Sequence, residues 1–156
     1  MTTQSASPRI HGSSVRNLTV HPDDRGRLFE ILRNDDPGFI RFGQVYVTTA
    51  FPGVVKAWHR HQKQTDFFCL IRGRARFALH DPRPDSPTRG QVDEIACDGA
   101  QPRLIVIPNL VYHGFKNIGS VDAICINCPT EVYNAAMPDE ERVDPYDNNI
   151  PHDWRR

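Results

Sequence analysis

The chain has 156 residues, and its 19 lysines and arginines balance 19 aspartates and glutamates, so the formal net charge is zero at pH 7. This balance argues against a nucleic-acid binder whose affinity comes from overall basicity. No apolar run approaches the roughly 20 residues of a membrane span, and no apolar signal segment begins the chain. We therefore expect neither nucleic acid nor a membrane among its partners. The four cysteines are spread through apolar sequence, which favours free thiols in a reducing cytoplasm over a disulfide framework.

Short strands separated by turns are predicted along most of the chain. Residues 1–15 are polar and expected to be a flexible segment, and residues 16–156 are expected to form one domain. The thirteen prolines and ten glycines imply many turns, and no long window has the 3.6-residue period of a helix. The predicted strands are residues 17–20, 27–33, 42–49, 66–71, 74–79, 91–96, 103–107 and 121–128. This spacing predicts a mostly β, single-domain fold, closed as an antiparallel barrel or jelly roll.

Three local patterns add detail to this prediction. The Arg72-Gly73 pair predicts a hairpin that joins the strands at 66–71 and 74–79. Residues 81–90 contain three prolines, which predicts an exposed loop, and residues 138–142 are predicted to make one helical turn. Alternation along residues 42–49 places Gln44, Tyr46 and Thr48 on one face.

The stretch from residue 53 to residue 73 carries the most chemistry-bearing side chains. His59 and His61 are two residues apart, so on a strand both point to the same face, away from Trp58 and Arg60. Asp66 follows five residues later, and His113 lies in a second stretch rich in apolar residues. We expect these imidazoles and the carboxylate to meet inside the barrel.

Two motifs of this chain are similar to those of the cupin superfamily. The first comprises Gly53, His59, His61, Asp66 and Gly73, with Asp66 where glutamate is usual, and the second comprises Pro108, His113 and Asn117. More narrowly, the chain resembles the dTDP-4-dehydrorhamnose 3,5-epimerase family. The matching pieces are Asp24, Arg25 and Gly26 with Glu30, then Gln44, Trp58 with His59, Arg83 with Ser86, Pro87, Thr88 and Gly90, the segment 107–115, Thr130 with Tyr133, and Trp154.

The resemblance implies a cupin β-barrel, a cytoplasmic homodimer and an enzyme that needs neither a metal nor a cofactor. The implied reaction is epimerisation of a dTDP-linked 4-keto-6-deoxy sugar, by proton abstraction and reprotonation next to the ketone. His59 is then the catalytic base, Lys56 or His113 stabilises the oxyanion, and Tyr133 is the catalytic acid, with Tyr112 as its competitor. The implied substrate-binding residues are Arg25, Glu30, Gln44, His61, Tyr112 and His113.

The chain also departs from the family pattern. Asp66 stands where the family has a lysine, and Asn127 stands where it has a tyrosine. The aspartate that pairs with the catalytic histidine follows the closing tryptophan in typical members, and its position falls beyond Arg156. Two alternatives therefore stay open. One is a metal-dependent cupin isomerase or dioxygenase that uses His59, His61, Asp66 and His113 as ligands. The other is a non-enzymatic module that binds a sugar nucleotide.

Overall fold

The computed structural model describes residues 10–156, and it is built from strands. Within these residues there are twelve β-strands and no helix. No helix long and apolar enough to cross a membrane was found in this part of the chain. The strands are β1 (Ser14–Asn17), β2 (Val20–Asp23), β3 (Gly26–Phe29), β4 (Tyr46–Ala50), β5 (Val55–Arg60), β6 (Asp66–Arg72), β7 (Arg74–His80), β8 (Val92–Asp98), β9 (Arg103–Ile107), β10 (Tyr112–Asn117), β11 (Ala123–Asn127) and β12 (Glu141–Arg142).

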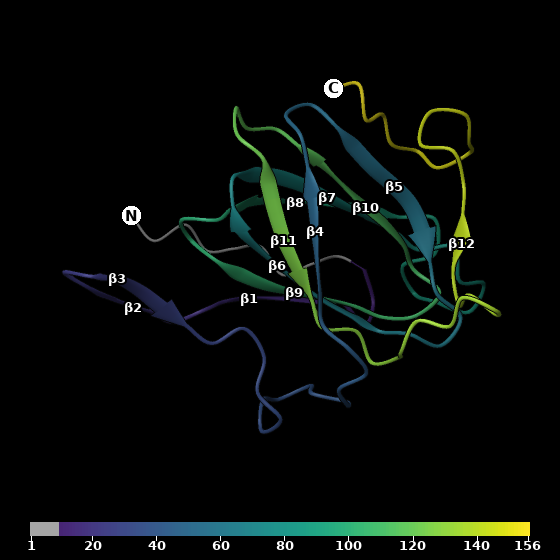
Figure 1. Cartoon of the computed structure of the whole chain (residues 1–156). Coiled ribbons are helices and arrows are strands. Elements are labelled where there is room, and N and C mark those ends of the chain that lie inside the picture. The colour runs from purple at the N-terminus through teal and green to yellow at the C-terminus, as the bar shows by residue number, and fades with distance from the viewer. Residues whose placement is uncertain (1–9) are drawn as a thin grey trace.

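Two five-stranded antiparallel sheets enclose the principal core (Figure 1). The first sheet has the order β1-β9-β6-β11-β4, and the second has the order β12-β5-β10-β7-β8. The hairpin of β2 and β3 stands apart and reaches away from the body of the molecule in Figure 1. Side chains of both sheets form one buried cluster, which includes Phe68, Leu70, Ile105, Ile107 and Cys125 from the first sheet and Phe77, Leu79, Ile95 and Phe115 from the second. The predicted antiparallel, mostly β fold is confirmed.

The outer face of each sheet is covered by a different end of the chain. On the first sheet, Phe67, Cys69 and Leu104 pack against Phe29, at the end of β3, and Ile31, just after it. On the second sheet, the cluster of Trp58, Ala78, Tyr112 and Trp154 packs against Val143 and Ile150 of the C-terminal tail. Burial of this apolar surface stabilises both outer layers. Both outer faces of the two sheets are therefore covered by other parts of the chain.

The predicted hairpin at residues 66–79 is wrong. β6 pairs with β9 and β11 in the first sheet, whereas β7 pairs with β10 and β8 in the second. The chain crosses between the sheets at Gly73, whose φ is +80° and where a Cβ would lie 2.8 Å from the carbonyl oxygen of Asp122. A glycine is therefore needed both for the left-handed backbone and for the close approach. The local pattern identifies the turn but not the sheet to which each strand belongs.

The boundaries of several other predicted elements also change. The helical turn predicted at 138–142 is wrong, because β12 forms there and pairs with β5. The strand predicted at 27–33 ends at Phe29, and the one predicted at 42–49 begins at Tyr46. The loop predicted at 81–90 contains no strand. The flexible segment predicted at 1–15 falls partly on residues 1–9, outside the described residues, while Ile10 is buried and β1 begins at Ser14.

Candidate active site

A pocket of about 730 Å³ opens between the two sheets. Its walls come from β4 of the first sheet, β5 of the second, and the segment that leads from β11 to β12. This volume suits a small organic ligand, because such pockets typically measure roughly 300–1,000 Å³. The lining residues include Gln44, Tyr46, Thr48, Lys56, His59, His61, Gln64, Phe68, Tyr133, Asn134, Asp139, Glu140 and Arg142.

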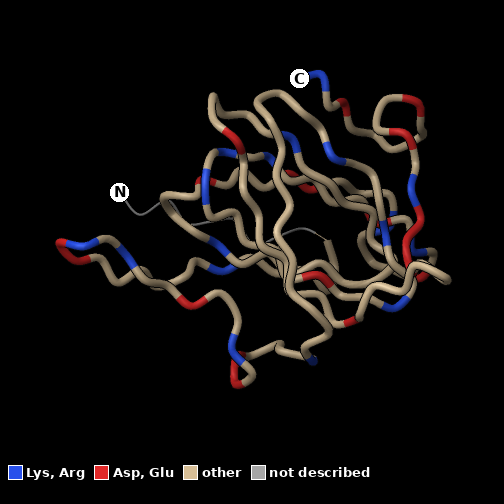
Figure 2. Tube along the Cα trace, in the orientation of Figure 1, with Lys and Arg blue, Asp and Glu red and all other residues tan. Residues whose placement is uncertain are grey.

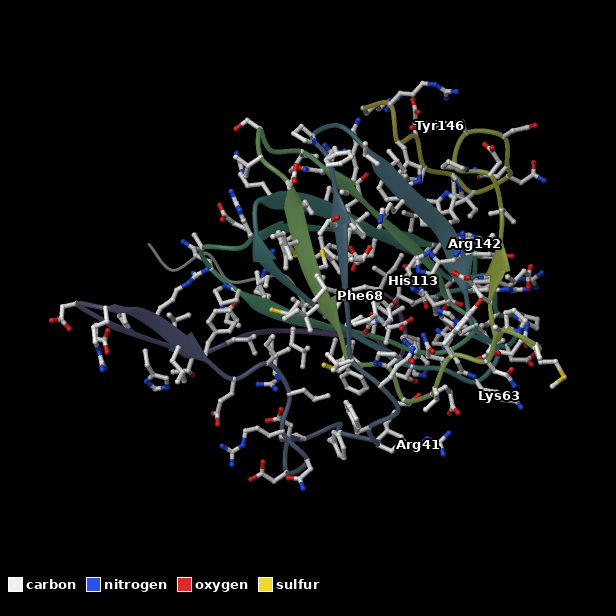
Figure 3. All side chains as sticks on the ribbon, in the orientation of Figure 1. Arg41, Lys63, Phe68, His113, Arg142 and Tyr146 are labelled. Atoms are coloured by element: carbon white, nitrogen blue, oxygen red, sulfur yellow. The ribbon has the colours of Figure 1, made fainter. Side chains whose placement is uncertain are left out.

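Three histidines converge at the inner end of this pocket, where His59 and His61 line the wall and His113 is buried beside them, outside the lining. His113 on β10 is the direct cross-strand partner of His59 on β5, and their ring centroids are 4.1 Å apart. One side-chain nitrogen from each of His59, His61 and His113 lies within 4.8 Å of the others. Figure 3 labels His113 and Phe68 in the space between the strands of the two sheets. The predicted meeting of the three imidazoles in the interior is confirmed.

Gly114 allows β10 to approach β5 closely beside His113. A Cβ at Gly114 would overlap the side chain of Ala57 on the neighbouring strand. The pairing of β10 with β5 also shifts register between His113 and Phe115. Such irregularities often re-aim a side chain next to a functional site. Here the strand pairing aligns His113 with His59 across the ladder.

The carboxylate of Asp66 connects the histidines to two amide side chains. Its Oδ2 atom lies 3.1 Å from Nε2 of His113 and 3.6 Å from Nε2 of His61. Its Oδ1 atom accepts hydrogen bonds of 2.7 Å from Gln64 and from Asn127. Burial alone would raise the pKa of Asp66, but His113, His61 and the hydrogen bond from Asn127 outweigh it and bring the pKa to about 2. Asp66 is therefore a carboxylate at neutral pH.

The remaining ring nitrogens of His61 and His113 face backbone carbonyls. Nδ1 of His113 lies 3.0 Å from the carbonyl oxygen of Val111, and Nδ1 of His61 contacts the carbonyl of Asp139. When Nδ1 donates to these oxygens, Nε2 is the atom of each ring that faces the site, and Nε2 of His61 lies 3.2 Å from the amide nitrogen of Gln64. Nε2 of His113 and Oδ2 of Asp66 are buried and face each other at 3.1 Å, with no other hydrogen-bond partner among the described residues. This donor set fits a bound cation, which three imidazoles and a carboxylate could hold.

His59 lies on the pocket wall as a neutral imidazole. Burial lowers its pKa well below the ordinary value, and the nearby His113 and His61 lower it further, whereas Asp66 acts in the opposite direction. No hydrogen bond to its ring is found among residues 10–156, so neither Asp66 nor Asp81 pairs with it directly. Asp81 is instead bound by Arg83 in the loop after β7. An unprotonated imidazole beside an open pocket can accept a proton from a ligand.

The predicted orientation of the neighbours of His59 is confirmed. Trp58 is fully buried in the outer cluster with Trp154, and the guanidinium of Arg60 lies 2.7 Å from a carboxylate oxygen of Glu141. Tyr112 lies on this outer side as well. Its hydroxyl donates a 2.5 Å hydrogen bond to Glu141, and its ring contacts Arg60. The structure therefore does not bring Tyr112 into the pocket.

The other residues singled out in the sequence fall into two groups. Lys56 lines the pocket and donates a 3.0 Å hydrogen bond to Thr48, and Gln44 accepts one from the backbone of Tyr133 at the rim. Arg25 and Glu30 lie at the β2–β3 hairpin, away from the pocket lining. Arg25 forms an ion pair with Asp23, and Glu30 forms one with Arg33.

Comparison with known proteins places the chain in a family. A family model described as "Polysaccharide biosynthesis C-terminal domain" matches residues 21–141, which is well over half of the chain. The chain belongs to this family. It is also 42% identical over 150 residues to the probable low-salt glycan biosynthesis epimerase Agl13 of Haloferax volcanii, a match that covers 94% of this chain and 96% of the relative.

Two further relatives connect this family member to the epimerases that it resembles in sequence. It is 28% identical over 146 residues to dTDP-4-dehydrorhamnose 3,5-epimerase of Mycobacterium tuberculosis, covering 87% of this chain and 70% of the relative. It superimposes with a TM-score of 0.90 on the crystal structure of a dTDP sugar isomerase from Desulfovibrio desulfuricans G20, at 30% identity and covering 97% and 96% of the two chains. The jelly-roll fold and the resemblance to this epimerase family are therefore confirmed.

Several residues of the site in this family member had no role in the sequence prediction. Tyr46 had only been placed on the same face as Gln44 and Thr48, and that alternation was the signal for it. Asn127 is bonded to both Asp66 and Tyr46. Arg142 pairs with His59 across β12 and β5, which a helical turn at 138–142 would have prevented. Figure 3 labels Arg142 on β12.

Proposed function

We propose that the protein is an epimerase of a dTDP-linked 4-keto-6-deoxy sugar, acting at C3, C5 or both. The observation that carries the proposal is a neutral His59 on the wall of a ligand-sized pocket, facing away from the outer cluster. The ketone makes a neighbouring C–H acidic because the resulting carbanion is an enolate. The names of the relatives, a glycan biosynthesis epimerase and a dTDP-4-dehydrorhamnose 3,5-epimerase, support the same reaction class.

In the proposed mechanism, His59 removes the proton next to the ketone, and the electron pair moves onto the ketone oxygen. Lys56, a cation on the pocket wall, or His113 stabilises the developing oxyanion. A tyrosine then donates a proton to the opposite face of the carbon, and two tyrosines, Tyr46 and Tyr133, line the pocket. Gln44 and His61 contact the substrate from the walls.

Hydrogen exchange at the sugar carbons tests this function. The protein is incubated in deuterated water with several dTDP-4-keto-6-deoxyhexoses, and the mass shift and stereochemistry of each sugar are measured. We expect deuterium at C3, C5 or both, together with an inverted product. Tight dTDP binding without exchange in any sugar of the panel would contradict the enzyme and favour a non-enzymatic sugar-nucleotide binding module.

We further propose a homodimer in which Arg25 and Glu30 of one subunit reach the pocket of the other. Both residues lie at the protruding hairpin, which Figure 2 shows with charged residues of both signs. Exposed apolar side chains gather on and beside β4, the edge strand of the first sheet, and a second subunit would cover them. They are Ile40, Phe42, Val45, Val47 and Phe51.

Complementation between inactive variants tests this dimer. We expect Arg25→Ala and His59→Asn each to be inactive alone and a refolded mixture to regain exchange, because a mixed dimer holds one site with both residues intact. Light scattering checks for the dimer directly. A monomer at micromolar concentration that binds dTDP tightly would contradict the proposal.

The four cysteines are free, which supports the further proposal that the protein works in the reducing cytoplasm.

A metal-dependent cupin isomerase or dioxygenase is the second candidate function. The observation that favours it is the donor set of His59, His61 and His113, with Oδ2 of Asp66 beside the last two. A bound divalent cation would supply Lewis-acid chemistry at this end of the pocket. On the epimerase proposal, native protein should contain Fe, Ni, Mn and Zn at well below one ion per chain. A stoichiometric metal that is lost in His61→Ala would favour the second candidate.

A further inference from the structure

Tyr46 and His59 face the pocket from opposite sheets. Tyr46 is on β4 of the first sheet, His59 is on β5 of the second, and both line the same pocket. Epimerisation requires a proton to leave one face of a carbon and another to arrive at the opposite face. A base and an acid on facing walls, with the sugar between them, meet this requirement.

The hydroxyl of Tyr46 is oriented by a fully occupied amide. Asn127 lies directly opposite Tyr46 on β11, and its Oδ1 accepts a 2.9 Å hydrogen bond from the backbone N–H of Phe67. That bond assigns the other end of the amide as NH₂. The two hydrogens of this NH₂ go to Asp66 Oδ1, at 2.7 Å, and to the oxygen of Tyr46, at 2.9 Å.

The proton of the Tyr46 hydroxyl is therefore free to be donated. The oxygen accepts from Asn127, and across residues 10–156 the hydroxyl makes no other hydrogen bond. The side chain of Tyr46 is 37% exposed, and partial desolvation in the pocket wall raises its pKa to about 12, with the Asn127 bond opposing this and the negative charges of Asp66 and Glu140 acting in the same direction. The phenol thus stays protonated at neutral pH, as a proton donor must.

Tyr133 has none of these features. Its side chain is 62% exposed at the rim of the pocket, and its only hydrogen bond found in the described part of the chain runs from its backbone N–H to Gln44. No hydrogen bond to its hydroxyl is found among residues 10–156, although the charge of Arg142 interacts with it. By contrast, the partner of Tyr46 across the ladder is Asn127, whose amide contacts the Tyr46 hydroxyl.

We propose that Tyr46 is the catalytic acid that returns the proton, on the face of the sugar opposite His59. This assignment rests on the proposed epimerase function and specifies the second half of its mechanism. The O–H bond of Tyr46 breaks as the new C–H bond forms, and the enolate electron pair makes that bond. Water then reprotonates the tyrosinate, and the proton that His59 removed passes to solvent, so both groups return to their starting states. Asn127 is a positioning residue, because its amide contacts the hydroxyl oxygen.

The ratio of inversion to exchange tests this acid. In Tyr46→Phe, His59 still removes the proton and can return deuterium to the same face, so exchange with retention continues. We expect the rate of epimer formation to fall by about 10²–10⁴-fold, the usual cost of removing a general acid, while the rate of deuterium incorporation (wash-in) falls much less. In Tyr133→Phe we expect the wild-type ratio, whatever its effect on KM. Tyr146→Phe, in the C-terminal tail outside the pocket, is the control for which we expect no change in either rate.

The outcomes distinguish three cases: Tyr46 is the catalytic acid, Tyr46 has only a structural role, or the protein is not an epimerase. The assignment would be overturned if Tyr46→Phe folds, binds dTDP and still inverts the sugar at the wild-type rate. It would also be overturned if the ratio of inversion to exchange falls in Tyr133→Phe alone. Absence of wash-in by the wild-type protein would overturn the epimerase function itself, and the acid with it. If Tyr46→Phe does not fold, 3,5-difluorotyrosine is introduced at position 46 and the rate of inversion is measured as a function of pH. We expect inversion to be lost at a lower alkaline pH than in the wild type, because the fluorinated phenol is more acidic. An unchanged pH profile would contradict the proposal.

Discussion

Replacing His59 with asparagine should lower exchange of the sugar C–H with solvent by about 10²–10⁴-fold, the usual cost of removing a general base. His59 is half-buried against His113 and open to the pocket, and desolvation holds its pKa well below the ordinary value. At neutral pH its ring is therefore free to accept a proton. Because no carboxylate is bonded to it, we also expect the wild-type rate to be modest for an epimerase, since a carboxylate partner would fix its tautomer.

Deuterium wash-in at the sugar carbons, with folding and dTDP binding checked first, measures this effect. His80→Asn is a matched control, because His80 lies on β7 outside the pocket lining, where its ring faces the backbone of Gln91 and stacks with the Tyr112 ring on the outer side of the sheet. We expect the control to keep the wild-type rate within twofold. Equal wash-in by wild type and His59→Asn would remove His59 from the mechanism, whichever sugar is used.

Short-range patterns predicted part of the inner end of the pocket. The two-residue spacing of His59 and His61 determines their common face on or beside a strand, and alternation does the same for Gln44, Tyr46 and Thr48. These relations hold wherever the strand lies in the molecule. The resemblance to cupins supplied the remaining element, His113, by a motif more than fifty residues away.

Long-range pairing explains what the sequence could not predict. The role of Asn127 depends on β11 lying between β4 and β6, so that one amide reaches both Tyr46 and Asp66. The Arg72-Gly73 turn resembles a hairpin because turn chemistry is local, whereas the sheets to which β6 and β7 belong are decided by their distant partners. Likewise, the acidic stretch before Arg142 suits a helical start, but pairing with β5 supplies the hydrogen bonds that a single helical turn cannot.

The second large effect is expected in the loop between β7 and β8. Asp81→Asn should lower the free energy of unfolding by about 3–5 kcal/mol, as when one partner of a buried ion pair is removed. Asp81 is fully buried and accepts hydrogen bonds from Arg83 at 2.7 Å, Ser86 at 2.5 Å and Thr88 at 2.6 Å. The amide would face three donors with one acceptor oxygen and would leave the charge of Arg83 without its carboxylate.

Urea denaturation as a function of pH separates this carboxylate from the others. Burial would raise the pKa of Asp81, but Arg83, Ser86 and Thr88 together hold it below the ordinary value of about 3.9. A depressed folded-state pKa means that the unfolded chain binds more protons in this range, so the contribution is complete above about pH 5 and is lost as the pH falls below about 4. The difference in the free energy of unfolding between wild type and Asp81→Asn should therefore become smaller in acid.

Asp85 is exposed in the same loop and provides the control. Asp85→Asn should change the free energy of unfolding by less than about 0.5 kcal/mol at every pH. If Asp81→Asn lowers the free energy of unfolding as little as Asp85→Asn does, or by the same amount at every pH down to 2, the buried carboxylate does not stabilise the loop as its contacts imply.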